Sequence, residues 1–270
     1  MSDVPQGDAA PLVLVSRPAP GVARIALNRP QQRNALTEEL AQALREEVRS
    51  LAATAGVRAL ILTGAGKTFC AGADLGALGR DRSTAEGMRQ ALAEYYRAFL
   101  DLRDLEVPTV AAVNGAAVGA GLNLALCCDL RVLSESARMA APFARLGIHP
   151  GGGATWMLSR LLGPGAAREL LLLGEPIGAD RALALGLATR VVTADQLEVV
   201  ALQWAVGLAK LSHPVVSDLR RTLRMAETGY DWDAVLDFET EAQARSLLSE
   251  DAREGWNAFK EHRQPQFHDR

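Results

Sequence analysis

The sequence predicts an α/β protein in which helices cover a parallel sheet and a helical region follows it. Residues 57–63, 109–113 and 130–133 are short, nearly all-apolar runs, typical of strands buried on both faces. Helical patterns separate these runs, and alternating strands and helices favour a parallel sheet. After residue 153 the composition shifts to long stretches rich in Ala, Leu and Arg, with only 190–192 resembling a strand. The expected helices cover 154–173, 179–187, 195–211, 214–228 and 233–262.

The first part of the chain has its own signals. Residues 12–16 and 22–27 are β-rich and are separated by two prolines and a glycine, which predicts an early hairpin. From Thr37, a plausible N-cap, apolar residues recur at three-to-four spacing and predict a helix. We therefore expect a loose N-terminus at 1–11, an α/β core at 12–193 and a helical C-terminal region at 194–270.

Composition excludes several classes of function. The 270 residues are 49% hydrophobic and 23% charged, and 29 basic against 32 acidic residues leave a net charge of −3. A nucleic-acid partner would call for a basic excess, so none is expected. The most apolar stretch, 115–128, is about half a membrane span, so no membrane partner is expected either.

Cysteine and histidine usage points to a protein without a metal. The three cysteines form no CxxC pair and the four histidines are scattered, so no metal site is expected. The start of the chain lacks a basic leader and a long apolar core, which argues against a signal peptide. The expected location is cytoplasmic.

Three loops are candidates for chemistry, at residues 28–36, 69–75 and 114–121. In the last two, glycines allow close backbone approach to a ligand, and peptide N–H groups at the end of a strand or start of a helix are unpaired. Two such loops on neighbouring strands could direct two N–H donors at one oxygen and form an oxyanion hole. The alternative is that these glycines serve only tight packing and turns.

The motifs in these loops resemble a known family. NRPQQRNAL from Asn28, FCAGADL from Phe69, VNGAAVGAGLNLALCCD from Val113 and PGGG from Pro150 are similar to the crotonase superfamily, the enoyl-CoA hydratase/isomerase group. The resemblance implies a spiral of ββα units with a helical C-terminal trimerisation region, assembled as a homotrimer or a hexamer (a dimer of trimers). It implies an acyl-CoA thioester as substrate, with coenzyme A as part of that substrate and no separate cofactor or metal.

The resemblance also places a site on this sequence. The N–H groups of Ala73 and Ala120 match the pair that stabilises a thioester enolate, although the family usually has glycine where Ala120 stands. An alanine keeps the backbone donor but adds a methyl group near the thioester. The residues matched to substrate or coenzyme A contacts are Arg33, Ala35, Leu36, Gly72, Asp74, Leu75, Gly119 and Phe143.

The sequence departs from the family at its acid and base. Family hydratases carry two glutamates, and the matching positions here are Asn123 and Phe143. Asparagine can orient a water but accepts no proton near neutral pH, and phenylalanine can do neither. Histidine is the residue type suited to exchanging protons near neutral pH, so His149 is the preferred substitute acid or base. The alternatives are that His149 is a structural histidine bonded to a backbone carbonyl, and that Asn123 satisfies a neighbouring backbone group.

Three hypotheses for the function follow. The first is an enoyl-CoA hydratase/isomerase-type enzyme with an altered acid–base set. The second is another crotonase-type reaction, such as thioester hydrolysis, decarboxylation or double-bond isomerisation. The third is an acyl-CoA binding protein with little or no turnover. The acyl chain is not specified, because its pocket depends largely on segment 76–100, whose helical spacing favours core filling over ligand contact.

Overall fold

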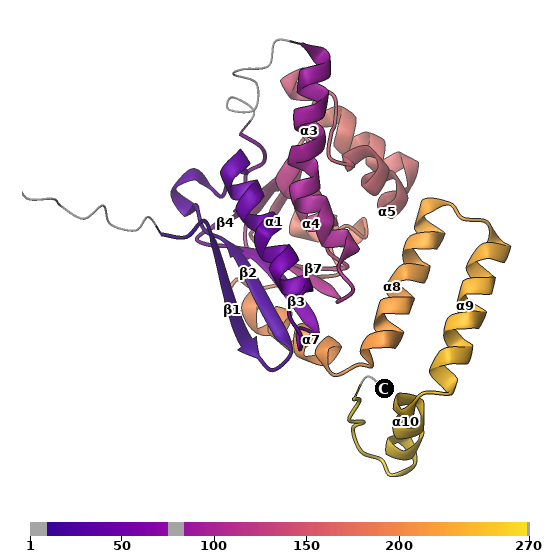
Figure 1. The fold of residues 1–270 in the computed structure, drawn as a ribbon. Helices are drawn as coiled ribbons and strands as arrows, with labels where there is room; N and C mark the ends of the chain where they lie inside the picture. The colour runs from indigo at the N-terminus through magenta and orange to yellow at the C-terminus, as the bar shows by residue number, and fades with distance from the viewer. Residues whose placement is uncertain (1–9, 75–83, 269–270) are drawn as a thin grey trace, which may run out of the picture.

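A computed structural model describes residues 10–74 and 84–268, and two layers of sheet organise its core. In this part of the chain the larger sheet has six strands in the order β1-β2-β3-β5-β7-β10. Only the β1–β2 pair is antiparallel, and the others run parallel (Figure 1). Its strands are β1 (Val13–Ala19), β2 (Val22–Leu27), β3 (Ala59–Gly64), β5 (Thr109–Val113), β7 (Leu130–Ser134) and β10 (Arg190–Val192). The predicted hairpin and the three predicted buried strands are therefore confirmed.

The second sheet is smaller and was missed by sequence patterns. Its order in the described residues is β4-β6-β8-β9, from β4 (Thr68–Cys70), β6 (Ala116–Val118), β8 (Arg138–Ala140) and β9 (Ile177–Gly178). Strands of two or three residues are too short to show the alternation by which a strand is recognised. β4 pairs in parallel with β6, and β6 with β8, so this sheet brings two of the glycine loops together.

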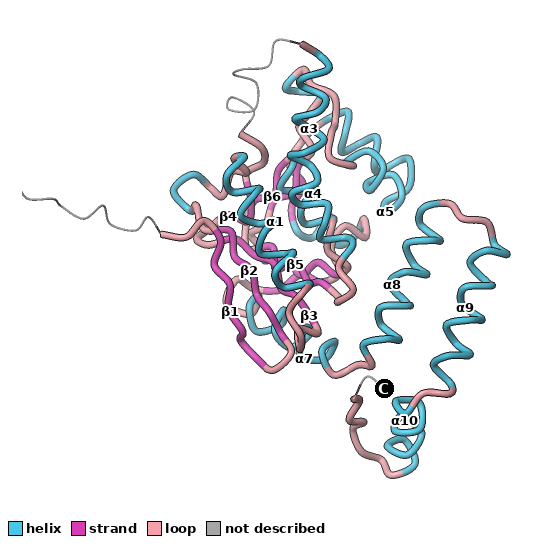
Figure 2. Tube along the Cα trace, in the orientation of Figure 1, coloured by secondary structure: helices cyan, strands magenta, loops and turns pink. Residues whose placement is uncertain are grey.

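Helices cover both faces of the larger sheet because its side chains alternate between two apolar clusters. One face, with Ile25, Leu62 and Val113, packs toward α1 (Glu38–Ala52) and α3 (Ala85–Leu100). The other face packs against α7 (Leu197–Ala209), which lies across the sheet from α1 in Figure 2.

Local signals explain where the first helices begin. The Thr37 hydroxyl accepts a hydrogen bond from the Leu40 N–H at 3.2 Å, which confirms the predicted N-cap of α1. The Thr84 hydroxyl caps α3 in the same way through Gly87. Such caps satisfy N–H groups that have no partner inside the helix.

The C-terminal half is helical, as predicted. The long stretch after residue 233 is divided into two helices, one that ends at Leu247 and a second whose first turn is capped by the Ser249 hydroxyl through the Ala252 N–H. The α-helices that follow α3 are α4 (Ala120–Leu126), which precedes this half, and α5 (Ala154–Arg168), α6 (Ala179–Ala184), α7, α8 (His213–Thr228), α9 (Trp232–Leu247) and α10 (Glu250–Lys260) within it.

Short helical turns connect several elements: η1 (Pro30–Gln32), η2 (Asp101–Asp104), η3 (Ala144–Leu146) and the π-helical turn η4 (Glu169–Leu173). Helices α8 and α9 run side by side at the edge of the core, and α10 follows below them in the view of Figure 1. Within the described residues no single helix is long and apolar enough to cross a membrane. Only α7 and α8 together reach that length, and they meet at a bend of 108°.

Candidate active site

The first and second loops are joined by backbone hydrogen bonds. The Ala71 N–H donates to the Arg33 carbonyl at 3.0 Å, and the Leu36 N–H donates to the Gly72 carbonyl at 2.8 Å. The Asp74 N–H donates back to the Leu36 carbonyl at 3.1 Å. The loops therefore form one short parallel bridge, with Leu36 opposite Ala73.

This bridge fixes the direction of the Ala73 N–H. The Gly72 carbonyl and the Asp74 N–H both face Leu36. The Gly72 carbonyl and the Ala73 N–H belong to the same trans peptide group, so they point in opposite directions. The Ala73 N–H consequently points away from the first loop. No acceptor for it lies among the residues that the structure describes.

The third loop approaches the second from the opposite side. A Cβ placed on Gly72 would lie 2.8 Å from the Val118 carbonyl oxygen and 3.9 Å from the Ala120 nitrogen. Ala120 is the first residue of α4, so its N–H has no acceptor inside the helix. The two N–H groups matched to the oxyanion pair are thus on adjacent loops.

Glycines in these loops serve backbone turns and close packing, the alternative weighed from the sequence. Gly72 and Gly119 have φ values of +106° and +53°, which L side chains rarely adopt. Gly121 has no such φ, but a Cβ there would lie 2.2 Å from the Cys70 carbonyl oxygen. The first pair shapes the turns that carry Ala73 and Ala120, and Gly121 lets α4 pack on β4.

Two residues that support the first loop had no assigned role in the sequence. Asn34 is fully buried, and its amide donates to the carbonyls of Ala65 and Thr68 at 3.0 and 2.7 Å while accepting from the Arg29 N–H at 2.8 Å. The Tyr95 hydroxyl of α3 donates to the Leu36 carbonyl at 2.9 Å. The only signal for Asn34 was its place in the NRPQQRNAL motif, and helical spacing marked Tyr95 as a core residue.

Asn123 is buried beside the site, with its amide committed to the backbone. Its side-chain nitrogen donates to the Gly151 carbonyl at 2.8 Å, and the residue is 1% exposed. Its amide oxygen is buried with no hydrogen-bond partner among the described residues. A Cβ on Gly152 would lie 2.9 Å from that nitrogen and within 3.1 Å of the Tyr96 and Phe99 rings. Asn123 therefore attaches the turn that contains Gly151 and Gly152 to α4.

Phe143 and His149 lie differently with respect to these loops. The Phe143 ring is half-buried and is 3.8 Å from where a Cβ on Gly119 would stand. His149 is exposed, and its Nδ1 lies 2.8 Å from the Pro150 carbonyl oxygen, the contact expected of a structural histidine. Nothing in the described structure joins His149 to Ala73 or Ala120.

The remaining predicted contacts are distributed around the first two loops. Ala35 and Asp74 are half-buried, and Arg33 is exposed at the rim with a left-handed backbone. Leu75 lies outside the described residues, as do the first residues of the segment expected to shape the acyl pocket.

Titratable groups near the site have raised pKa values. Burial raises the pKa of the Cys70 thiol to about 12 and raises the pKa values of the Tyr95 and Tyr96 hydroxyls. All three groups are therefore uncharged at neutral pH. In the described ranges, no three His, Cys, Asp or Glu side chains lie close enough together to hold a metal ion.

Comparisons with known proteins identify the family of the chain. The sequence model of the enoyl-CoA hydratase/isomerase family matches residues 18–270. The chain belongs to this family. It is similar to the "Probable enoyl-CoA hydratase EchA14" of Mycobacterium tuberculosis, at 45% identity over 203 residues, which cover 75% of this chain and 78% of that protein.

A second relative and a solved structure extend the similarity to almost the whole chain. The 1,2-epoxyphenylacetyl-CoA isomerase of Escherichia coli is 35% identical over 256 residues, covering 94% of this chain and 97% of the relative. The crystal structure of an enoyl-CoA hydratase from Bacillus anthracis superimposes with a TM-score of 0.90 at 34% identity. That superposition covers 96% of this chain and 100% of the other. The predicted crotonase-like α/β fold is thereby confirmed.

Proposed function

We propose that this member of the family binds acyl-CoA thioesters and stabilises their enolates through the N–H groups of Ala73 and Ala120. The observation that carries the proposal is the arrangement of the two loops. The Ala73 N–H points away from Leu36, and Gly72 packs against Val118 next to the Ala120 nitrogen. Two donors directed at one developing oxyanion are worth several kcal/mol of transition-state stabilisation, about 2.7–4 kcal/mol for each donor. Coenzyme A enters as part of the substrate, and no separate cofactor is required.

The proposed chemistry differs from that of an ordinary hydratase. Neither Asn123 nor Phe143 can transfer a proton, and the loss of an acid or a base slows a reaction about 10²–10⁴-fold for each role. The Asn123 amide is also already bonded to Gly151. Hydration of an enoyl-CoA should therefore be slow, whereas enolate-stabilising reactions that need less proton transfer remain open. His149 stays the candidate for a substitute acid or base, although it is exposed.

Low turnover or binding alone is the second candidate function. It is favoured by the lack of a carboxylate at Asn123 and Phe143. A pair of backbone donors without a neighbouring base holds a thioester but does not remove its α-proton. Exchange of the α-protons of butyryl-CoA in D₂O distinguishes the two candidates. An enolate-forming enzyme exchanges them, and a binding protein does not.

The decisive experiment combines calorimetry with a hydration assay. We expect the wild-type protein to bind acyl-CoA and to hydrate crotonyl-CoA slowly, followed by the absorbance of the conjugated thioester. The double variant Asn123→Glu/Phe143→Glu should hydrate faster, and Asn123→Gln/Phe143→Gln, of similar size but without carboxylates, should not. Phe143→Glu alone is the fallback if the buried Asn123 position does not accept a charge. Absence of acyl-CoA binding by the wild-type protein would overturn the proposal.

The exposed apolar side chains of the C-terminal helices support the predicted homotrimer or dimer of trimers. Trp232, Leu248 and Phe259 are 76%, 86% and 75% exposed, and they lie on α9, at its C-terminal end and on α10. Large apolar groups exposed in this number are typical of surfaces that associate. A cytoplasmic location stays a prediction.

A further inference from the structure

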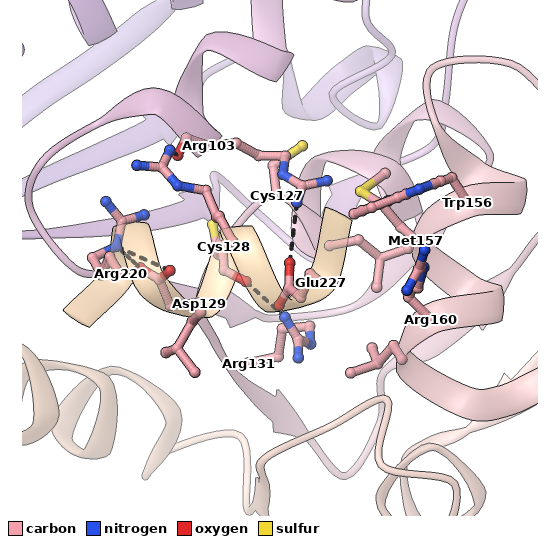
Figure 3. Close-up of a pocket in the computed structure, with 14 residues that line it drawn as sticks. Arg103, Cys127, Cys128, Asp129, Arg131, Trp156, Met157, Arg160, Arg220 and Glu227 are labelled. Carbon is pink, nitrogen blue, oxygen red and sulfur yellow. Dashed lines mark hydrogen bonds and ion pairs between the residues drawn. The ribbon is translucent and has the colours of Figure 1, made fainter. Parts of the chain in front are cut away.

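A cavity lies at the opposite end of α4 from the Gly119–Ala120 turn. It has a volume of about 310 Å³ and is enclosed by the end of α4, α5 and α8 (Figure 3). Because α4 has seven residues, about 10 Å of helix separates it from the proposed active site. Its charged and aromatic lining consists of Arg103, Asp129, Arg131, Trp156, Arg160, Arg220, Arg224 and Glu227.

The two carboxylates of the cavity are already paired. Asp129 accepts from the Arg220 Nε at 3.0 and 3.1 Å and from the Thr109 N–H and hydroxyl at 2.7 and 2.8 Å. Glu227 accepts from Arg103 at 3.2 Å. Of the five arginines that line the cavity, Arg220 and Arg103 are thus paired with its two acids, which leaves Arg131, Arg160 and Arg224.

Arg131 carries a buried charge without a carboxylate among its hydrogen-bond partners. The residue is 7% exposed, and its guanidinium donates to the carbonyls of Leu187 and Cys128 at 2.7 and 2.6 Å. Burial lowers its pKa. Carbonyls solvate a cation but do not cancel its charge, so an anion nearby would be stabilised.

Arg224 is in a similar position. It donates to the Arg103 carbonyl and reaches the Asp104 carboxylate only at 3.5 Å, and that carboxylate is 83% exposed at the rim. Burial, followed by repulsion from Arg220, lowers the pKa of Arg224. The positive charge of Arg131 and Arg224 is therefore incompletely compensated by carboxylates.

Two guanidinium groups of the cavity, those of Arg103 and Arg160, lie over the Trp156 ring. The Arg103 guanidinium lies 4.8 Å from the centre of the Trp156 ring, and the Arg160 guanidinium lies 5.7 Å from it. Arg160 is exposed, and this ring is its one charged or aromatic contact within the described residues. Its donors are therefore available to a ligand.

We propose that this cavity is a binding site for a compact anion with at least two negative charges, either a phosphate ester or a polycarboxylate. Guanidinium forks match the oxygens of both groups. A volume of about 310 Å³ is at the small end of ligand pockets, which favours a small ligand over an acyl-CoA. The site is distinct from the thioester site and does not depend on the function proposed for it.

The test is a titration of the assembled full-length protein with pyrophosphate and, separately, with citrate, at constant ionic strength set by chloride. We expect saturable binding by calorimetry and a change in tryptophan fluorescence. Trp156→Phe should lose the fluorescence change but keep the calorimetric signal. Binding of just one of the two anions also supports the proposal, and it shows whether the site takes phosphate or carboxylate groups.

Charge variants separate a built site from general attraction. Arg160→Gln should weaken binding at least about tenfold, the usual effect of losing one hydrogen bond to a charged group. The matched control is Arg253→Gln on α10, whose side chain is 72% exposed and lies outside the cavity lining. Failure of both anions to bind saturably, or equal weakening by the two variants, would overturn the proposal.

Discussion

The position of Asn123 decides how the site would tolerate a carboxylate, and Asn123→Asp tests this directly. The Gly151 carbonyl receives its hydrogen bond from the Asn123 amide, in surroundings formed partly by the Tyr96 and Phe99 rings. A protonated Asp could still donate to that carbonyl, but an ionised one could not and would be buried without a partner. The pKa of the introduced carboxyl should therefore be raised above the value of about 3.9 that it has in an unfolded chain.

The sign of the pH dependence follows from proton counts. Between the unfolded and folded pKa values the folded variant holds more protons, so the free energy of unfolding falls as pH rises. The slope approaches about 1.4 kcal/mol per pH unit, so the variant should lose up to about 2.7 kcal/mol relative to wild type between pH 5 and pH 7.

Urea unfolding at pH 5, 6 and 7, at one protein concentration, measures this loss. Asn123→Leu is the control, since it also removes the hydrogen bond to Gly151 but cannot titrate. It should be destabilised by about 1–3 kcal/mol, independently of pH. If Asn123→Asp shows the same pH dependence as Asn123→Leu, the reasoning about this buried position is refuted.

Two further predictions concern packing and thiol chemistry. Gly121→Ala should destabilise the fold by about 1–3 kcal/mol in thermal or urea unfolding, because the new methyl would lie 2.2 Å from the Cys70 carbonyl oxygen. Gly165→Ala, with open space at its Cβ position, should be neutral or stabilising, and equal losses in the two variants would contradict the packing argument. The three cysteines are buried with raised pKa values, so a thiol reagent at pH 8 should react slowly with the folded protein and rapidly in guanidinium. Fast reaction of the folded protein would show that the thiols are accessible.

Much of the fold was predictable because its signals are local. The runs that become β3, β5 and β7 are nearly all-apolar, and Thr37 marks the start of α1 by its own hydroxyl. The small sheet was not predictable, because β4 and β6 are three-residue strands that exist through their pairing with each other. The functional assignment of the loops came from the family resemblance, since no local pattern distinguishes Gly72 from a glycine in an ordinary turn.

The sequence by itself determined the fold class, the family motifs and the absence of glutamates at positions 123 and 143. Only the tertiary structure decided which atoms these residues contact. Asn123 faces the Gly151 carbonyl, 28 residues further along the chain, and Arg131 faces the carbonyl of Leu187, 56 residues away. Such contacts form when packed elements bring distant backbone groups together, and a buried donor is stabilised by whichever acceptor that packing supplies.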